Sequence, residues 1–302
     1  MLPFARVTVI GLGLIGSSIA RGVRAHMPGA NVTGYDADPR VRARAAELGF
    51  CHDVTDTPGA AVMDADLVVL CVPPGAMGAA AASLADDLPA DAVVSDVGSC
   101  KASVAAAIAE ALPQAIVIPA HPVAGTENSG PDAGFASLFH GRWCIITPPE
   151  GANAGAVTRL EAFWRLLGAD VEQMAAEHHD RVLAVTSHLP HLIAYTIVGT
   201  ASDLEEVTRS EVIKYSAGGF RDFTRIAASD PTMWRDVFLA NREAVLEMLQ
   251  RFTEDLTALQ RAIRWGKGEE LFELFERTRA IRRSIVEQGQ DDARPDFGRL
   301  HD

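Results

Sequence analysis

The chain has few cysteines, and none of them are arranged in pairs. Its four cysteines stand far apart, at Cys51, Cys71, Cys100 and Cys144. A disulfide framework or a structural zinc site needs closer and repeated spacing. Reduced thiols in a cytosolic protein are therefore the better interpretation.

Clustered positive charge and long hydrophobic runs are also missing. The formal net charge of the 302 residues is −13 and no block of lysine or arginine stands out, so nucleic acid is not expected as a partner. The most apolar stretch, 191–200, is too short and too polar to span a bilayer, and we expect no membrane partner. No signal peptide is expected ahead of a first strand that begins by about Arg6, which favours a cytoplasmic location.

A glycine-rich turn between a strand and a helix is the first positive feature. Residues 7–10 are β-branched, Gly11-Leu12-Gly13-Leu14-Ile15-Gly16 follows, and 17–25 has helical periodicity. In such a turn the first glycine permits the tight bend, the second lets the backbone approach a pyrophosphate, and the third lets helix and strand pack closely. Residues 11–16 are therefore predicted to bind a dinucleotide.

An acidic residue ends the next predicted strand. Asp36 follows Asn31–Tyr35, at the distance of about 20 residues from the glycines that dinucleotide-binding folds use. A carboxylate there accepts hydrogen bonds from the ribose and repels a 2′-phosphate, which favours NAD over NADP. Arg40 and Arg42 lie close by and would weaken that discrimination.

Strands and helices go on alternating through the first half of the chain. Short apolar strands are predicted at 67–72, 92–96, 115–119 and 143–147, and alanine-rich helices at 76–84 and 101–112. This alternation is typical of βαβ units. The fold class is therefore α/β, with an N-terminal Rossmann-type doubly wound parallel sheet. The same fold without a nucleotide is the alternative.

A histidine follows one of these strands. In Pro119-Ala120-His121-Pro122 the imidazole is expected at the carboxyl edge of the sheet, where ligands bind in open α/β folds. Histidine titrates near neutral pH and can take a proton from a substrate hydroxyl. Ser99 follows a neighbouring strand and would orient His121 or contact the nicotinamide. The alternatives are a structural histidine at a turn, and a serine that caps the helix near Lys101.

Helical periodicity replaces the alternation from about Glu177. We expect a dinucleotide domain over 1–174, an all-α substrate and dimerisation domain over 175–288, and a flexible tail over 289–302. His188-Leu189-Pro190-His191 is predicted to open a helix that reaches about Thr200. Its two histidines lie one turn apart, but no third ligand is spaced to complete a metal site. A polar substrate contact or a buried hydrogen-bonded pair is favoured, and no metal is expected.

One long helix is predicted from Asp230 as N-cap and Pro231 at the first helical position towards Trp265. Its apolar positions, mostly three and four residues apart, are Phe238, Val245, Leu249, Phe252, Leu256, Leu259 and Ile263. This stripe favours burial against a second subunit, with an intrachain core as the alternative.

Two arginines flank an aspartate in Gly218-Gly219-Phe220-Arg221-Asp222-Phe223-Thr224-Arg225. The rigid guanidinium fork suits a carboxylate ligand. An internal Arg–Asp ion pair is the alternative for one of the two, Arg221.

Five motifs together resemble the prephenate/arogenate dehydrogenases, which are NAD-dependent enzymes of tyrosine biosynthesis. The resemblance runs from Val7 to about Gln288. Its motifs are the glycine turn, Asp96–Lys101, His121–Glu127, Ser187–His191, and Phe220–Ala227 continuing to Trp234.

The resemblance implies NAD-dependent oxidative decarboxylation of prephenate to 4-hydroxyphenylpyruvate, CO2 and NADH, with arogenate as a possible second substrate. It implies that His121 is catalytic, that Ser99 orients it, that Arg225 binds the ring carboxylate and that His191 faces the side chain. The further substrate-binding residues it implies are Ser187, His188, Glu127, Thr126, Asp222 and Trp234. The implied cofactor-binding residues are Gly11, Leu12, Gly13, Leu14, Ile15, Gly16, Asp36, Val72, Pro73 and Ser99. A homodimer is expected, and a regulatory ACT domain is not.

Three rivals stay open. An arogenate-specific dehydrogenase differs only in the substrate side chain. A β-hydroxyacid dehydrogenase would use a lysine of the helical domain, yet Lys214 and Lys267 are the only lysines after Lys101, and neither lies in these motifs. A dinucleotide-sensing scaffold without activity would not be expected to keep Ser99, His121 and Arg225 together.

Overall fold

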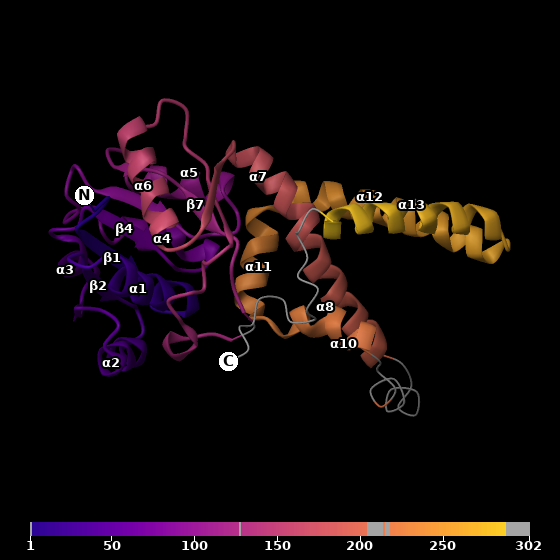
Figure 1. Ribbon diagram of the computed structural model, residues 1–302, viewed down its shortest axis with the longest axis horizontal. Coiled ribbons are helices and arrows are strands. Elements are labelled where there is room, and N and C mark those ends of the chain that lie inside the picture. The colour runs from indigo at the N-terminus through magenta and orange to yellow at the C-terminus, as the bar shows by residue number, and fades with distance from the viewer. Residues whose placement is uncertain (1, 127, 204–213, 215–217, 288–302) are drawn as a thin grey trace. The chain divides into compact units, whose positions relative to one another are not determined.

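The computed structural model describes residues 2–126, 128–203, 214 and 218–287. It divides into two compact units, Met1–Leu246 and Glu247–Asp302 (Figure 1). The predicted boundary at 174 falls inside the first of these units and stays a prediction about function. The predicted tail lies outside the described residues.

A six-stranded parallel sheet forms the centre of the first unit, with the strand order β3-β2-β1-β4-β5-β6. Strands β4 and β5 are buried along their whole length, as expected when helices cover both faces of a sheet. The doubly wound sheet predicted from the sequence is confirmed. Its elements are β1 (Arg6–Ile10), α1 (Leu14–His26), β2 (Asn31–Tyr35), α2 (Pro39–Leu48), β3 (Asp53–Val54), α3 (Pro58–Val62), β4 (Leu67–Leu70), η1 (Pro74–Ala76), α4 (Met77–Ala82), β5 (Val93–Asp96), α5 (Ala102–Ala111) and β6 (Ile116–Val117).

A second sheet of three strands corrects two expectations. It consists of β7 (Ala120–Pro122), β8 (Trp143–Ile146) and β9 (Asp170–Gln173), with β7 antiparallel to β8. The strand at 143–147 is therefore not part of the parallel sheet. His121 does not lie in a turn either, because it is paired with Ile145 inside β7.

The chain passes from the parallel sheet to the three-stranded sheet at Pro119. Ile118 still donates its N–H to Val94 at 2.9 Å, whereas the carbonyl of Pro119 accepts from the N–H of Thr147 at 2.9 Å. Proline has no N–H with which to continue a ladder. The chain therefore leaves β5 at this point and pairs with β8. The loop that follows contains η2 (Pro131–Ala133), and α6 (Ala154–Leu166) connects β8 to β9.

A continuous helix of 27 residues, Ala176–Ser202, follows β9. It consists of α7 (Ala176–Leu183), a π-helical turn η3 (Ala184–His188) and α8 (Leu189–Ser202), so it begins well before the predicted start at His188. Pro190 is accommodated because the π-turn ahead of it opens the hydrogen-bond ladder that proline cannot join.

The length and composition of this helix would allow it to cross a membrane, with a mean hydropathy of 1.4 in its most apolar window. The helix is longer than the apolar stretch 191–200, and one helix of this kind is by itself weak evidence of a membrane span. Hydrogen bonds join it to other elements of the first unit at two points: the backbone carbonyl of Asp180 accepts from the side-chain amide of Asn241 at 2.8 Å, and Tyr195 donates to the carbonyl of Ser229 at 2.9 Å.

The predicted single helix from Pro231 to Trp265 is two helices. After α10 (Gly218–Thr224) and η4 (Arg225–Ala228), Asp230 caps α11 (Pro231–Ala240) as predicted, accepting from the N–H of Met233 at 2.8 Å. Asn241 then leaves helical geometry, with φ −107° and ψ 33°. The next helices are α12 (Arg242–Arg264), which runs into the second unit, and α13 (Gly268–Glu287).

Hydrophobic cores cover both faces of the parallel sheet. One contains Phe139, Phe163 and Trp164. The other contains Met77 and Val104 together with Trp234 and Val237 of α11. This second core places α11 against the helices of the parallel sheet, and it thereby fixes the position of Trp234.

Candidate active site

The glycine turn forms an open cradle at the start of α1. Gly11 has φ +96°, and a Cβ there would lie 2.5 Å from the carbonyl oxygen of Cys71, so only glycine fits. A Cβ on Gly16 would collide with the carbonyl of Gly11. At Gly13 nothing lies within 4 Å of the Cβ position, and Gly13 begins α1 without a side-chain cap. This open helix N-terminus fits a pyrophosphate group.

Asp36 is held against this cradle. Its carboxylate accepts hydrogen bonds from the N–H of Leu12 at 2.8 Å and of Asp38 at 2.9 Å. Arg40 is paired with Asp38 at 2.7 Å, and Arg42 donates to the backbone carbonyl of Asp36 at 2.9 Å. Both guanidinium groups that could attract a 2′-phosphate therefore have other partners.

His121 lies buried in β7 with one ring nitrogen engaged. Its Nδ1 is 2.8 Å from Nε2 of His179, and the ring centroids are 5.0 Å apart. Burial lowers the pKa of His121 well below its ordinary value, and the neighbouring His179, Lys101 and His188 lower it further. The imidazole is therefore neutral at pH 7 and able to accept a proton.

The second ring continues the chain to a carboxylate. Nδ1 of His179 lies 2.8 Å from Oδ1 of Asp180, whose oxygens also accept from the N–H groups of Lys101 at 2.7 Å and Ala102 at 2.9 Å. Burial acts to raise the pKa of Asp180, but the hydrogen bonds from His179 and the two backbone groups outweigh it and the pKa is lowered. Asp180, and not Ser99, therefore caps α5.

A buried ion pair lies against β7. The fully buried ammonium group of Lys101 pairs with Asp96 and donates to the carbonyl of Ala120 at 2.6 Å. The cation is thus fixed next to the residue that precedes His121.

Aromatic and cationic side chains from the later helices form a second group. His191 stacks on Trp234 with ring centroids 3.6 Å apart, and His188 lies 6.1 Å from the same indole. Burial lowers the pKa of His191, and the charge of Arg225, an exposed residue, lowers it too. Asn241 contacts Nδ1 of His188 at 3.1 Å, which joins this group to Asp180.

One buried polar atom in this group, Nε1 of Trp234, has no hydrogen-bond partner among the residues described. The His188 ring interacts with the backbone of Ser99 as well as with Asn241. Unsatisfied buried groups are uncommon and call for an explanation such as a ligand. One series of contacts therefore runs from His121 through Asp180, Asn241 and His188 to Trp234 and His191, and it includes an indole N–H that a ligand can satisfy.

Family comparisons agree with this arrangement. The family description "Prephenate dehydrogenase, nucleotide-binding domain" matches residues 19–173, and "Prephenate dehydrogenase, dimerization domain" matches residues 175–277. The chain belongs to the prephenate dehydrogenase family.

Individual relatives cover nearly the whole chain. It is 46% identical to a cyclohexadienyl dehydrogenase of Zymomonas mobilis, over 94% of this chain and 97% of that protein. It is 31% identical to a prephenate dehydrogenase of Bacillus subtilis, over 91% and 75%. The structure of Aquifex aeolicus prephenate dehydrogenase with hydroxyphenyl propionate and NAD+ matches with a TM-score of 0.87 and 33% identity, covering 94% of this chain and 98% of that one.

The remaining residues that the family resemblance singles out are less deeply buried than His121, His188 and Trp234. Ser99 and Val72 are half-buried, and Pro73, Thr126 and Asp222 are exposed. Ser187 contributes its carbonyl, 2.9 Å from Nδ1 of His191. Glu127 lies outside the described residues. Arg221 forms no ion pair with Asp222, both of which are described.

The two histidines of the prephenate dehydrogenase dimerisation region do not share a metal-like geometry. His188 faces Asn241, whereas His191 lies flat on Trp234. In the part of the chain that the structure describes, no group of three or more His, Cys, Asp or Glu side chains is placed to hold a metal ion.

Sequence reasoning overlooked His179, Asp180, Lys101 and Asn241. The His178-His179-Asp180 run was a usable signal, because two histidines followed by an acid near the start of a helix are unusual. Which of the two histidines faces inward, however, is decided by packing.

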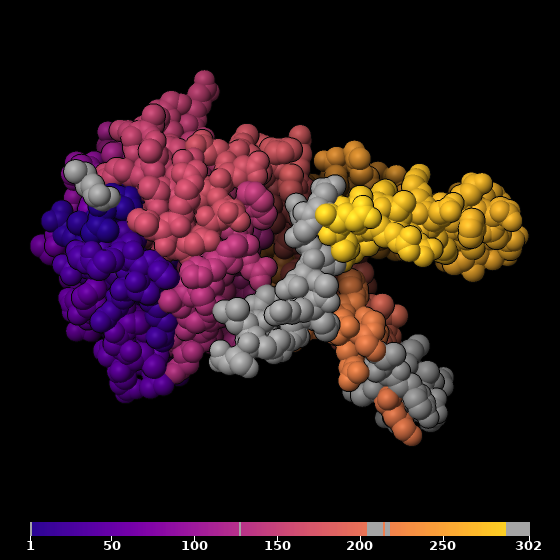
Figure 2. All heavy atoms as spheres, in the orientation of Figure 1, coloured from indigo at the N-terminus to yellow at the C-terminus, as the bar shows by residue number. Residues whose placement is uncertain are grey.

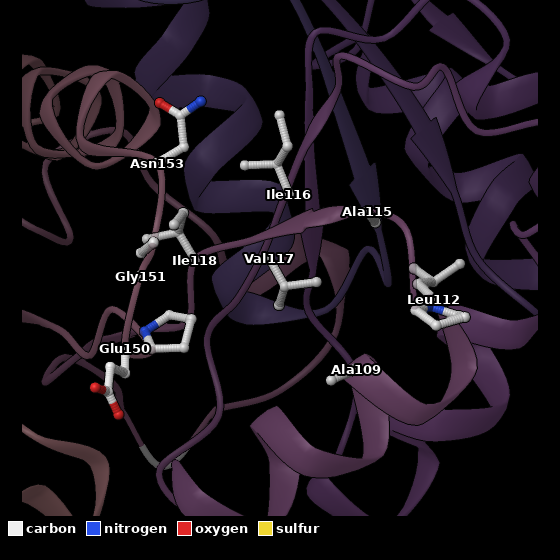
Figure 3. A pocket seen from close by; sticks show the side chains of 12 residues that line it. Ala109, Leu112, Ala115, Ile116, Val117, Ile118, Glu150, Gly151 and Asn153 are labelled. Carbon is white, nitrogen blue, oxygen red and sulfur yellow. The ribbon is translucent and has the colours of Figure 1, made fainter.

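A surface hollow of about 330 Å³ lies elsewhere, beside the edge strand β6. Figure 3 shows Ile116 and Val117 of that strand facing it on one side and Glu150 and Asn153 on the other. None of the predicted site residues line it, so it is separate from the candidate active site.

Proposed function

We propose that this protein is an NAD-dependent prephenate dehydrogenase of tyrosine biosynthesis, which converts prephenate to 4-hydroxyphenylpyruvate, CO2 and NADH. Membership of the family and the similarity to an NAD+ complex support this function. The observation that carries it is the neutral, buried His121 joined by one series of contacts to His191 and Trp234, with the charge of Arg225 acting on His191.

The cofactor supplies the acceptor for a hydride from the ring carbon that carries the hydroxyl group. Residues 11–16 and Asp36 would hold it. His121 accepts the hydroxyl proton at Nε2 while the C–H bond breaks as hydride. The ring carboxylate then departs as CO2, its electron pair completes the aromatic ring, and the phenol oxygen recovers the proton.

Arg225 binds the ring carboxylate in this proposal, and His191 with the indole N–H of Trp234 faces the side chain. The charge of Arg225, close enough to lower the pKa of His191, disfavours the ammonium group of arogenate. We therefore place prephenate first and arogenate second, and an arogenate-specific enzyme is the alternative.

A cytoplasmic homodimer completes the proposal, with no nucleic acid, membrane or metal partner. The description of residues 175–277 as a dimerisation domain supports the assembly. So do the apolar side chains that α12 and α13 leave exposed.

Purified protein is mixed with NAD or NADP and with prephenate or arogenate, and nicotinamide reduction is followed by absorbance. Rapid reduction of NAD with prephenate is the expected result. Turnover with arogenate but not with prephenate would make arogenate the substrate. No turnover with either compound would overturn the proposed function.

A further inference from the structure

Three side chains that are far apart in sequence form one buried hydrogen-bonded chain. His121 lies in β7, and His179 and Asp180 lie in α7. Nδ1 of His121 meets Nε2 of His179 at 2.8 Å, and Nδ1 of His179 meets Asp180 at 2.8 Å. The His179 ring is wholly buried.

Hydrogen bonding along this chain fixes where the protons lie. Asp180 is ionised, because its pKa is lowered, and a carboxylate only accepts. His179 must therefore carry its proton on Nδ1 and donate it to Asp180. A neutral His179 then presents a lone pair at Nε2, so His121 must donate from its own Nδ1. In a neutral imidazole this leaves Nε2 of His121 without a proton.

The opposite order is unfavourable. It would place the lone pair of His179 Nδ1 against the Asp180 carboxylate, two acceptors 2.8 Å apart. A proton on Asp180 would relieve that contact, but its two hydrogen bonds from the N–H groups of Lys101 and Ala102 stabilise the ionised form.

We propose that His179 and Asp180 are positioning residues that hold His121 in the Nδ1–H tautomer, with Nε2 free to accept the substrate proton. They also stabilise the imidazolium that forms when it does so. This role rests on the proposed function, since it presumes that His121 is the base.

The charged surroundings explain why a carboxylate is needed. The charges of Lys101 and His188 act on His121, and those of Lys101, Asp96 and Asp180 act on His179. Burial and Lys101 both disfavour a positive charge on His121, which keeps the resting base neutral. Asp180 opposes them through His179 once a proton arrives, in the way that a carboxylate supports the histidine of serine proteases.

Tautomers are measured directly in protein labelled with 15N-histidine and saturated with NAD. Long-range 1H–15N spectra report which ring nitrogen carries hydrogen, and His121→Asn and His179→Gln assign the two rings. We expect both rings as Nδ1–H tautomers. An Nε2–H tautomer at His121 would overturn the proposal, and this result is independent of whether wild-type protein oxidises prephenate.

Kinetics provide the second test, with a neighbouring histidine as control. His179→Gln is expected to lower kcat by about 100-fold, with KM for prephenate and the affinity for NAD nearly unchanged. His178→Gln, one residue away on the exposed side of α7, should retain wild-type turnover. Wild-type kcat in His179→Gln would refute the role.

Asp180→Asn separates positioning from simple support of the fold. Loss of the carboxylate charge should lower kcat and shift the acid limb of kcat/KM to lower pH by about one unit, because the remaining pair binds a proton less well. Reduced activity with an unmoved acid limb would show that Asp180 only stabilises the start of α5.

Discussion

The two compact units differ in how far they bury their large apolar side chains. The first unit buries Phe163 and Trp164 completely in the core of the parallel sheet. In the second, Trp265 is 64% exposed, Phe272 62% and Phe275 55% (Figure 2, where α13 is yellow). Of the predicted stripe on α12, Leu256 and Ile263 are also exposed.

This difference separates chemistry from assembly. Every described side chain of the candidate site belongs to the first unit, which has a complete core of its own. Large exposed apolar surfaces on a soluble protein mark association sites. The second unit is therefore expected to be completed by another copy of the chain, whereas the acid–base chemistry should depend on residues before Leu246.

The largest effect should come from the base itself. His121→Asn removes the proton acceptor and should lower kcat by about 100-fold or more. Steady-state kinetics measure this loss, while calorimetric titration with NAD and the mass of the dimer should match wild type. Unchanged turnover would remove His121 from the mechanism and leave the site without a base.

Charges on α13 should act on assembly alone. Phe272→Asp combined with Phe275→Asp places two carboxylates on the exposed apolar face and should raise the dimer dissociation constant by about 100-fold, as for the loss of interface hot spots. Sedimentation velocity measures it, with Glu273→Gln on the same helix as control. A dimer of unchanged stability would mean that this face is covered in some other way.

Arg225 should affect substrate affinity more than turnover. Arg225→Ala removes a charge-assisted hydrogen bond, so KM for prephenate should rise by about tenfold to a hundredfold. Arg221 on α10, which is exposed like Arg225, offers a matched control, because Arg221→Ala removes the same charge from the same region while the charge that acts on His191 is that of Arg225. Normal prephenate affinity in Arg225→Ala would show that the carboxylate is held elsewhere.

Acid should weaken the first unit selectively. Burial lowers the pKa of His188 to about 4 and also lowers those of His121, His179 and His191. Below pH 6.5 these histidines become protonated in the unfolded chain but stay neutral in the folded protein. The free energy of unfolding therefore falls as the pH drops from 6.5 towards 4. His188 alone should cost about 2 kcal/mol at pH 5. Urea unfolding at pH 7 and pH 5 measures this, and equal midpoints would contradict it.

The sequence predicts the parallel sheet well because its signals are local. The glycine turn, the β-branched run before it and Asp36 are each readable within a few residues. The exchange of sheets at Pro119 is not local, because it depends on a partner strand, β8, further along the chain.

The same reasoning explains which parts of the site escaped prediction. His121 and Arg225 stand in recognisable motifs, whereas His179 and Asn241 act through packing between elements. Asn241 follows the last residue of α11, and its side chain contacts Asp180 and His188. Helical periodicity in the sequence does not reveal these contacts. Buried polar partners become visible only when the tertiary structure is known.

The π-helical turn Ala184–His188 sets the angle about the helix axis between the side chains of α7 and those of α8. A helix advances about 100° for each residue, so a single additional residue turns everything beyond it to a new direction. Here α7 directs His179 towards β7, while α8 directs His191 onto Trp234. Deleting one residue from the turn would restore regular winding and point α8 away from the indole, which would separate the positioning of His121 from the His191–Trp234 stack without altering either set of side chains.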